Sequence, residues 1–195
     1  AYDVRTGRLR WTFHVVPRKG EPGNDTWLND SWTYSGNSGV WSLISGDDEL
    51  GYVYLPTEEA TGDYYGGTRP GNNLYAESIV ALDVKTGKRV WHQQTVKHDI
   101  WNYDNPTAPI LLDVNVGGRR VPGLFQITKQ SYVYSYNRQT GEPIWPMESR
   151  PAPASACPGS SSAGSGTDSP AACGTRPRRD RPGRPLLHRP QPRRG

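Results

Sequence analysis

Short runs of apolar residues alternate with turn-forming residues along most of this chain. The runs lie at residues 52–55, 79–82, 110–116, 124–127 and 132–134. Runs of this length, rich in Val, Ile, Leu and Tyr and bounded by Gly, Pro, Asp or Asn, are typical of β-strands. Gly117-Gly118 between two such runs predicts a two-residue hairpin turn. The pattern therefore predicts an all-β fold, and the content of Gly 22 and Pro 18 argues against long helices.

A repeated element that ends in tryptophan supports this interpretation. Residues 1–11 (AYDVRTGRLRW) match residues 81–91 (ALDVKTGKRVW), and residues 135–145 (SYNRQTGEPIW) are a looser third copy. In each copy an Asp or Asn can accept hydrogen bonds from the amides of the following turn. The Gly that follows Thr supplies the positive φ that a tight turn needs. Each copy therefore predicts a hairpin.

The closing Trp of each copy predicts how successive units join. Trp presents a large apolar plate with one N–H, which suits docking against a neighbouring unit. Hairpin-ended units joined in this way predict a β-propeller, whose blades are four-stranded sheets around a central channel. We expect a partial β-propeller of about three blades over residues 1–150. Trp11, Trp91 and Trp145 should hold equivalent positions, pack blades together and take no part in chemistry.

Composition changes abruptly near residue 150. The net charge of +4 belongs to the C-terminal part, where nine Arg and no Lys stand against three acids from Pro146 onward. Low-complexity Gly/Ser/Pro/Arg sequence cannot bury enough apolar surface to fold. We predict that residues 151–195, with Cys157 and Cys173, form a disordered basic tail. It is either a natural tail or the product of a reading-frame shift in a GC-rich gene, and the abrupt change favours the shift.

Composition also excludes some classes of function. A mean hydropathy of −0.78 rules out a membrane-spanning helix in this sequence. Since the basic charge is confined to the tail, it does not indicate a nucleic-acid-binding surface on the folded part, and we expect no nucleic-acid partner.

The repeat resembles that of pyrroloquinoline quinone (PQQ) dehydrogenases. Residues 36–42 (GNSGVWS), 61–78 (TGDYYGGTRPGNNLYAES) and 98–106 (HDIWNYDNP) are similar to the membrane-bound quinoprotein glucose dehydrogenase branch, and residues 128–130 (TKQ) follow at the matching distance. The resemblance implies an eight-bladed propeller of several hundred residues, of which this chain is a fragment. It also implies oxidation of a glucose-like sugar or an alcohol by hydride transfer to PQQ, with Ca²⁺ or Mg²⁺ and a quinone-type electron acceptor.

The same resemblance implies a location at the periplasmic face of the bacterial inner membrane, with the parent protein anchored by segments outside this sequence. We expect the fragment alone to be inactive, because a pocket at a propeller axis is built from blades on all sides.

Three residues match positions that contact the cofactor in this family. Trp41 matches the Trp that stacks on the quinone, and Thr61 matches an active-site threonine beside it. Lys129 matches a Lys or Arg that donates to the quinone oxygens, so it is a candidate for both binding and catalysis. From the residues alone, Trp41 could equally be an inter-blade Trp and Thr61 a turn cap.

The position of the family's catalytic base departs from the family pattern. That base is an Asp directly after the Trp of a His-Asp-x-Trp-Asp loop, and this sequence has Asn102 there. A neutral amide cannot take a proton. Asp99 and Asp104 are the carboxylates of the loop, and in an extended loop Asp104 points to the same side as residue 102. Asp104 is therefore the better substitute.

No metal ligand is assigned from the sequence. Glu58 and Glu59 lie at about the place where related alcohol-oxidising enzymes have a metal ligand, but a surface-loop role is the simpler interpretation. The alternative function is a non-catalytic β-propeller scaffold that binds envelope protein partners. Lys129 and the insert at residues 63–67 favour the enzyme, since a scaffold has no use for them.

Overall fold

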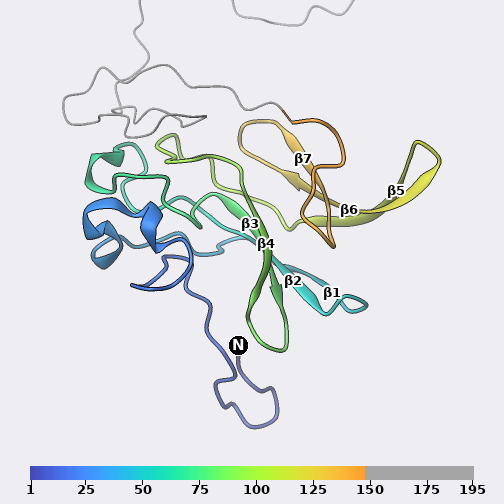
Figure 1. The fold of residues 1–195 in the computed structure, drawn as a ribbon, viewed down its shortest axis with the longest axis horizontal. Helices are drawn as coiled ribbons and strands as arrows, with labels where there is room; N and C mark the ends of the chain where they lie inside the picture. The colour runs from blue at the N-terminus through green and yellow to red at the C-terminus, as the bar shows by residue number, and fades with distance from the viewer. Residues whose placement is uncertain (148–195) are drawn as a thin grey trace, which may run out of the picture.

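The computed structural model describes residues 1–147, which form two antiparallel sheets with a hairpin at the N-terminal end (Figure 1). The first sheet has the order β1-β2-β3-β4 and the second the order β5-β6-β7. The strands are β1 (Ser45–Asp47), β2 (Tyr52–Pro56), β3 (Ser78–Asp83), β4 (Arg89–Gln94), β5 (Ile110–Val116), β6 (Arg119–Ile127) and β7 (Val133–Asn137). The only helical segments in this range are the short 3-10 turns η1 (Asn24–Thr26), η2 (Leu28–Thr33) and η3 (Gly66–Thr68).

Sequential antiparallel strands of this kind are the construction of propeller blades, so the predicted all-β partial propeller is confirmed. The three repeat copies belong to the N-terminal hairpin, the first sheet and the second sheet in turn. The predicted tail at residues 151–195, including Cys157 and Cys173, lies outside the described residues. Within the described part, no helix is long and apolar enough to cross a bilayer.

The predicted strands are present, and one is longer than expected. The apolar run at residues 110–116 is β5, and the Gly117-Gly118 turn after it has positive φ at both residues. The run at residues 124–127 is only the second half of β6, which begins at Arg119 because Arg119–Gly123 pairs with Val116–Leu112. The alternation of apolar and polar residues is weak in this first half, so the sequence did not reveal it.

The repeat turns form as predicted. Oδ1 of Asp83 accepts hydrogen bonds from the amides of Lys85 (3.0 Å) and Thr86 (2.8 Å), and Asp3 makes the equivalent bonds one repeat earlier. Oδ1 of Asn137 accepts from the amide of Gln139 at 2.9 Å. A fourth turn of the same kind, which the repeat pattern missed, joins β1 to β2: there Asp47 Oδ1 accepts from the amides of residues 49 and 50.

The Trp of one repeat docks on the turn of the next. Trp11 Nε1 donates to the carbonyl of Val84 (2.9 Å), and Trp91 Nε1 donates to the carbonyl of Arg138 (3.0 Å). Val84 and Arg138 follow the turn Asp or Asn of their repeats, so these two Trp side chains are equivalent, as predicted. Trp145 follows its own turn at the same spacing, but its half-exposed ring lies beside Phe125.

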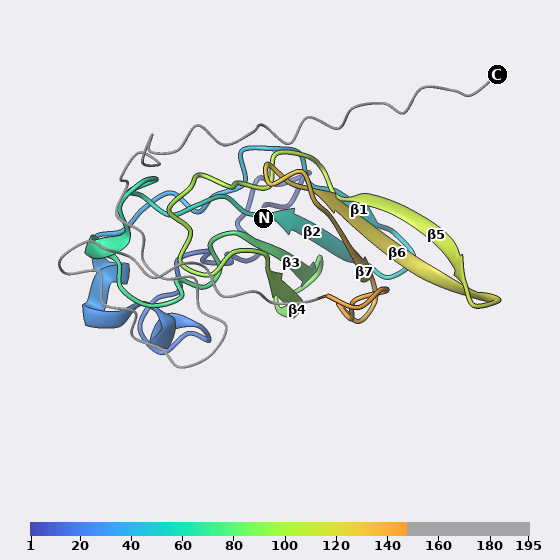
Figure 2. The same cartoon turned by 90° about the horizontal axis from the view of Figure 1, so that it is seen from above.

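Strand β3 is buried on both faces and forms the centre of the described fold. Ile79 and Ala81 face the second sheet, where they pack in one cluster with Tyr54, Trp91, Leu124 and Tyr136. Val80 and Leu82 face the N-terminal segment and pack with Tyr75, against which Trp11, Phe13 and Val15 lie. The two sheets therefore pack against each other through an apolar cluster, and Figure 2 shows their strands side by side.

Candidate functional site

The Lys129 ammonium group is the point where three of the predicted segments meet. Lys129 lies in the turn between β6 and β7, and its Nζ donates to Asp104 Oδ2 (2.6 Å) and to Asn102 Oδ1. The same Nζ lies 5.7 Å from the centre of the Trp41 ring, within the range of a cation–π contact. Trp41 is 54% exposed, and its predicted stacking on the cofactor stays a prediction. The structure thus brings together Trp41, Asn102, Asp104 and Lys129.

The loop at residues 98–106 is held by Asp99. Its Oδ1 accepts from the amide of Trp101 (3.0 Å) and its Oδ2 from the amide of Tyr103 (2.7 Å), while the side chain is buried. Burial raises the pKa of Asp99, and the backbone donors oppose that rise. Both oxygens are occupied by the loop itself, so Asp99 shapes the loop rather than facing Lys129.

The prediction that the loop around Asn102 is extended is wrong. Asn102 has φ 57°, so the loop is not extended at that residue. Asn102 and Asp104 nevertheless reach the same ammonium group, because the left-handed turn at Asn102 brings both side chains to Lys129. The amide Nδ2 of Asn102 donates to Asp63 Oδ2 (3.3 Å), which ties the loop to the Gly-rich insert.

The surface-loop interpretation is wrong for Glu59, which is 2% exposed. Its Oε1 pairs with Arg69 Nη2 at 2.9 Å, and its backbone amide donates to Asp104 Oδ1 at the same distance. Burial raises the pKa of Glu59 to about 9, although Arg69 opposes that rise. Glu58 is only partly buried, and its Oε1 accepts from the amide of Gly39 (3.0 Å). Burial, followed by the charges of Asp104 and Asp63, raises its pKa.

Arg69 is the residue of this region that sequence reasoning missed. Its guanidinium group is buried and donates to Thr61 O (3.1 Å), Asn73 Oδ1 (2.9 Å), Glu59 Oε1 and Asp99 O. It therefore connects the Gly-rich insert to the loop at residues 98–106. One feature of the sequence could have indicated Arg69. It is the single cation inside the Gly- and Pro-rich run Gly66-Gly-Thr-Arg-Pro-Gly71, and a side chain that only faces solvent would not require so specialised a backbone around it.

Thr61 contributes through its neighbours. Its Oγ1 accepts from the amide of Gly36 (3.2 Å), and its own amide donates to Gly36 O (3.1 Å). These two bonds fix the segment that leads to Trp41. Thr61 thus bridges two segments that are 25 residues apart, while its predicted contact with the cofactor stays a prediction.

The donor set fits a planar anionic cofactor better than it fits a metal ion. An exposed indole ring beside an ammonium group offers a stacking plate and a cation, the two features that a planar polycarboxylate needs. Among residues 1–147, no group of three His, Cys, Asp or Glu side chains is placed to hold a metal ion. Metal ligands therefore stay unassigned, and Ca²⁺ or Mg²⁺ stays a prediction.

Comparison with known proteins extends these observations. A family model described as "PQQ: Glucose/ethanol/alcohol dehydrogenase, beta-propeller domain" matches residues 1–176. The chain is 38% identical over 160 residues to the quinoprotein glucose dehydrogenase of Escherichia coli (strain K12), covering 81% of this chain and 20% of that protein. It is 37% identical over 155 residues to the glycerol dehydrogenase large subunit of Gluconobacter oxydans (strain 621H), covering 78% of this chain and 20% of that protein.

Comparison with solved structures also finds dehydrogenases that resemble this chain. A quinohemoprotein alcohol dehydrogenase of Pseudomonas putida HK5 superposes with TM-score 0.66 and 30% identity, over 74% of this chain and 24% of that one. A europium-containing methanol dehydrogenase superposes with TM-score 0.64 and 28% identity, over 74% of this chain and 28% of that one. The chain thus spans about a fifth of the length of the curated relatives it matches. It belongs to the β-propeller domain family of PQQ-dependent glucose, ethanol and alcohol dehydrogenases.

Proposed function

We propose that this chain supplies one side of the cofactor and substrate site of a PQQ-dependent dehydrogenase that oxidises a glucose-like sugar or an alcohol. The observation that carries the proposal is the convergence of Trp41, Asn102 and Asp104 on the Lys129 ammonium. These residues come from segments far apart in the sequence, and a scaffold that binds only proteins has no need to gather them.

Each residue has a separate task in this proposal. Trp41 presents its exposed ring as a stacking surface for a planar ring system. Lys129 donates hydrogen bonds to oxygens of the bound cofactor, and Asn102 holds Lys129 in place. When bound, PQQ supplies an ortho-quinone that accepts hydride from the alcohol carbon.

Asp104 is the proposed base that takes the proton of the substrate hydroxyl. Its two oxygens accept from different donors, Oδ1 from the Glu59 amide and Oδ2 from Lys129. This leaves lone pairs on a carboxylate of defined orientation, which a general base needs. Asn102 cannot take that proton, and Asp99 is committed to the amides of its own loop.

The rest of the proposal depends on the resemblance of residues 61–78 and 98–106 to the membrane-bound branch of the family. It comprises a quinone-type electron acceptor, a site at the periplasmic face of the bacterial inner membrane, and Ca²⁺ or Mg²⁺ as a second cofactor. A parent protein carries the remaining blades, and the chain by itself is expected to be inactive.

Turnover of the parent protein with PQQ, a divalent metal and an artificial electron acceptor tests the proposal. Asp104→Asn should lower turnover by about 10²–10⁴-fold while PQQ binding survives. Lys129→Ala should weaken both binding and turnover. Lys85→Ala, which removes an exposed Lys from the β3–β4 turn, is the control and should change neither. Parental turnover in Asp104→Asn together with its loss in Asp99→Asn would show that the wrong carboxylate was chosen. If both Asp variants stay active, the base lies outside this loop.

A further inference from the structure

Glu77 is a buried acid that the proposed reaction does not use. It lies immediately before β3, its side chain has no exposed area, and neither Oε1 nor Oε2 has a hydrogen-bond donor among the described residues. A carboxylate in such a place would be both desolvated and unpaired, which is strongly unfavourable. The buried position therefore favours the protonated, neutral form of the Glu77 side chain.

The backbone directs this side chain inward. Glu77 has φ 48°, in the left-handed region that residues other than Gly rarely adopt. Its N–H donates to Glu58 O (3.2 Å), and its carbonyl accepts from the amide (2.7 Å) and the hydroxyl (2.8 Å) of Thr95. The first of these bonds attaches Glu77 to the Glu58-Glu59 segment, whose next amide donates to Asp104. Glu77 and Asp104 are thus held against the same two residues.

The strongest electrostatic influences on Glu77 come from acids, two of which are paired with Arg69 and Lys129. Asp99, Asp104 and Glu59 are the charged groups that act most strongly on it. Burial, followed by these neighbouring acids, raises the pKa of Glu77 well above its usual range. A neutral Glu77 has an O–H to donate, and the backbone brings it toward Asp104, because the Glu77 amide bonds to Glu58 O and the next amide, that of Glu59, bonds to Asp104 Oδ1.

We propose that Glu77 is a neutral carboxylic acid whose O–H donates to the carboxylate of Asp104, and that it is a positioning residue for the Asp104–Lys129 pair. Asp104 is then held from three sides: by the Glu59 amide, by the Lys129 ammonium and by the Glu77 acid. The influence of Glu77 on turnover rests on the proposed function, whereas its protonation and its hold on Asp104 do not.

The first test is nuclear magnetic resonance of side-chain carboxyl carbons in the complete 195-residue chain, without cofactor or substrate. The Glu77 carbon should keep the chemical shift of a neutral acid from about pH 5 to 8, where an ordinary glutamate, with a pKa near 4.3, is ionised. A Glu77 carbon that titrates together with the exposed glutamates overturns the proposal. This measurement needs no variant, so it holds even where a substitution prevents folding.

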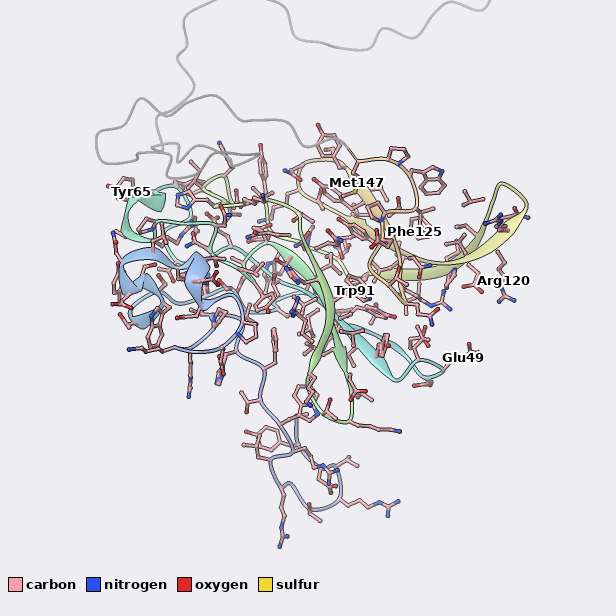
Figure 3. All side chains as sticks on the ribbon, viewed as in Figure 1. Glu49, Tyr65, Trp91, Arg120, Phe125 and Met147 are labelled. Carbon is pink, nitrogen blue, oxygen red and sulfur yellow. The ribbon has the colours of Figure 1, made fainter. Side chains whose placement is uncertain are left out.

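The second test uses two variants of similar volume that differ in donor capacity. Glu77→Gln retains an N–H donor for Asp104, whereas Glu77→Met fills the space without one. The carboxyl-carbon chemical shift of Asp104 should move away from the wild-type value in Glu77→Met, which removes the donor, and should stay near the wild-type value in Glu77→Gln. Glu49→Gln, on the exposed β1–β2 turn labelled in Figure 3, is the control.

Equal Asp104 chemical shifts in the Met and Gln variants show that only packing matters at this position and refute the proposal. Because no measurement here uses PQQ or substrate, an inactive parent protein would count against the proposed function and leave this inference standing.

Discussion

The indole of Trp91 lies directly against Gly141 of the next repeat. A Cβ built on Gly141 would lie 2.7 Å from Cδ2 of Trp91, and the same indole donates its N–H to the neighbouring carbonyl of Arg138. Trp11 and Gly87 repeat this relationship one unit earlier, where the corresponding distance is 2.5 Å. The conformation of the turn and the docking of the next unit therefore depend on the same glycine. In Figure 3, Trp91 is labelled on β4, between the two sheets.

Alanine substitutions at Gly141 and Gly118 should distinguish the steric clash of a Cβ with Trp91 from the energetic cost of the left-handed backbone. Gly141 has φ 78° and Gly118 has φ 79°, but a Cβ on Gly118 meets nothing within 4 Å. Gly118→Ala should therefore lower the free energy of unfolding by about 1 kcal/mol, the cost of the left-handed conformation. Gly141→Ala should lower it by about 1–3 kcal/mol more, since the turn or the Trp must move. Chemical denaturation of both variants measures the difference, and equal losses would mean that the Trp91 contact is loose.

The buried Arg69–Glu59 pair should be costly to break from one side. Arg69→Met leaves Glu59 Oε1, Asn73 Oδ1 and the carbonyl of Thr61 without their buried donor and should destabilise the chain by about 3–5 kcal/mol. The double variant Glu59→Gln/Arg69→Met should recover part of that loss, because the Gln amide can donate to one of the acceptors that Arg69 leaves. Arg120→Met, which removes an 83% exposed partner of Asp113 from the hairpin tip, should cost no more than about 1 kcal/mol. Thermal unfolding of these variants and of the single variant Glu59→Gln measures the losses. If the effects of Glu59→Gln and Arg69→Met simply add in the double variant, the two side chains are not energetically coupled.

Stability should fall as pH rises from about 7 to 9. Glu59 and Glu77 have raised pKa values, so the folded state holds protons that the unfolded state has released above about pH 4.5. Their stabilising effect is complete below that pH and is lost as pH rises through the folded-state pKa values, about 9 for Glu59. His92 and His98 do not interfere in this window. The pKa values of His92 and His98 are lowered by burial to about 4, so their effect is confined below about pH 6.5.

Glu77→Gln should flatten this decline, by up to about 1.4 kcal/mol per pH unit. Denaturation midpoints of the wild type and of Glu77→Gln, measured at several values between pH 7 and 9, provide the comparison. Parallel curves would mean that Glu77 carries the same charge in the folded and unfolded states.

Trp41 should matter for cofactor binding and little for folding. In the parent protein, Trp41→Ala should weaken PQQ binding about tenfold, the effect of removing one stacking surface. Trp145→Ala removes an indole of similar exposure that has no ammonium group over it, so it should leave PQQ affinity unchanged. Titration of Trp fluorescence with PQQ gives both affinities. Equal losses in the two variants would exclude Trp41 from the cofactor site.

The parts of this molecule that the sequence predicts are those decided locally. The turn at Asp83 requires only the amides two and three residues ahead, so the pattern Asp-x-x-Thr-Gly was enough to find it. Strand β1 was missed because Ser-Gly-Asp carries no apolar signal and pairs only through its partner β2. Arg69 and Glu77 were missed for another reason. Charged residues are usually exposed, and what buries Arg69 is a carboxylate ten residues away and a carbonyl thirty residues away.

The contact among the candidate site residues could be predicted from the sequence only in part. Lys129 was chosen through family spacing and Asp104 through the extended-loop argument, and their contact needs both sheets to be in place. The left-handed backbone at Asn102 left no trace in the loop composition, so the extended-loop argument used the wrong geometry, and the role of Asp104 as the base stays a prediction.

The contact between Trp41 and Lys129 joins residues that belong to different sheets. Trp41 precedes β1, and Lys129 follows β6, so their separation of 5.7 Å is fixed by how the two sheets align. A slip of one sheet past the other, with every strand still intact, would pull them apart. The distance between Trp41 and Lys129 therefore reports on the alignment of the two sheets. Mild heating or denaturant should therefore disable the site before circular dichroism registers any loss of β-structure.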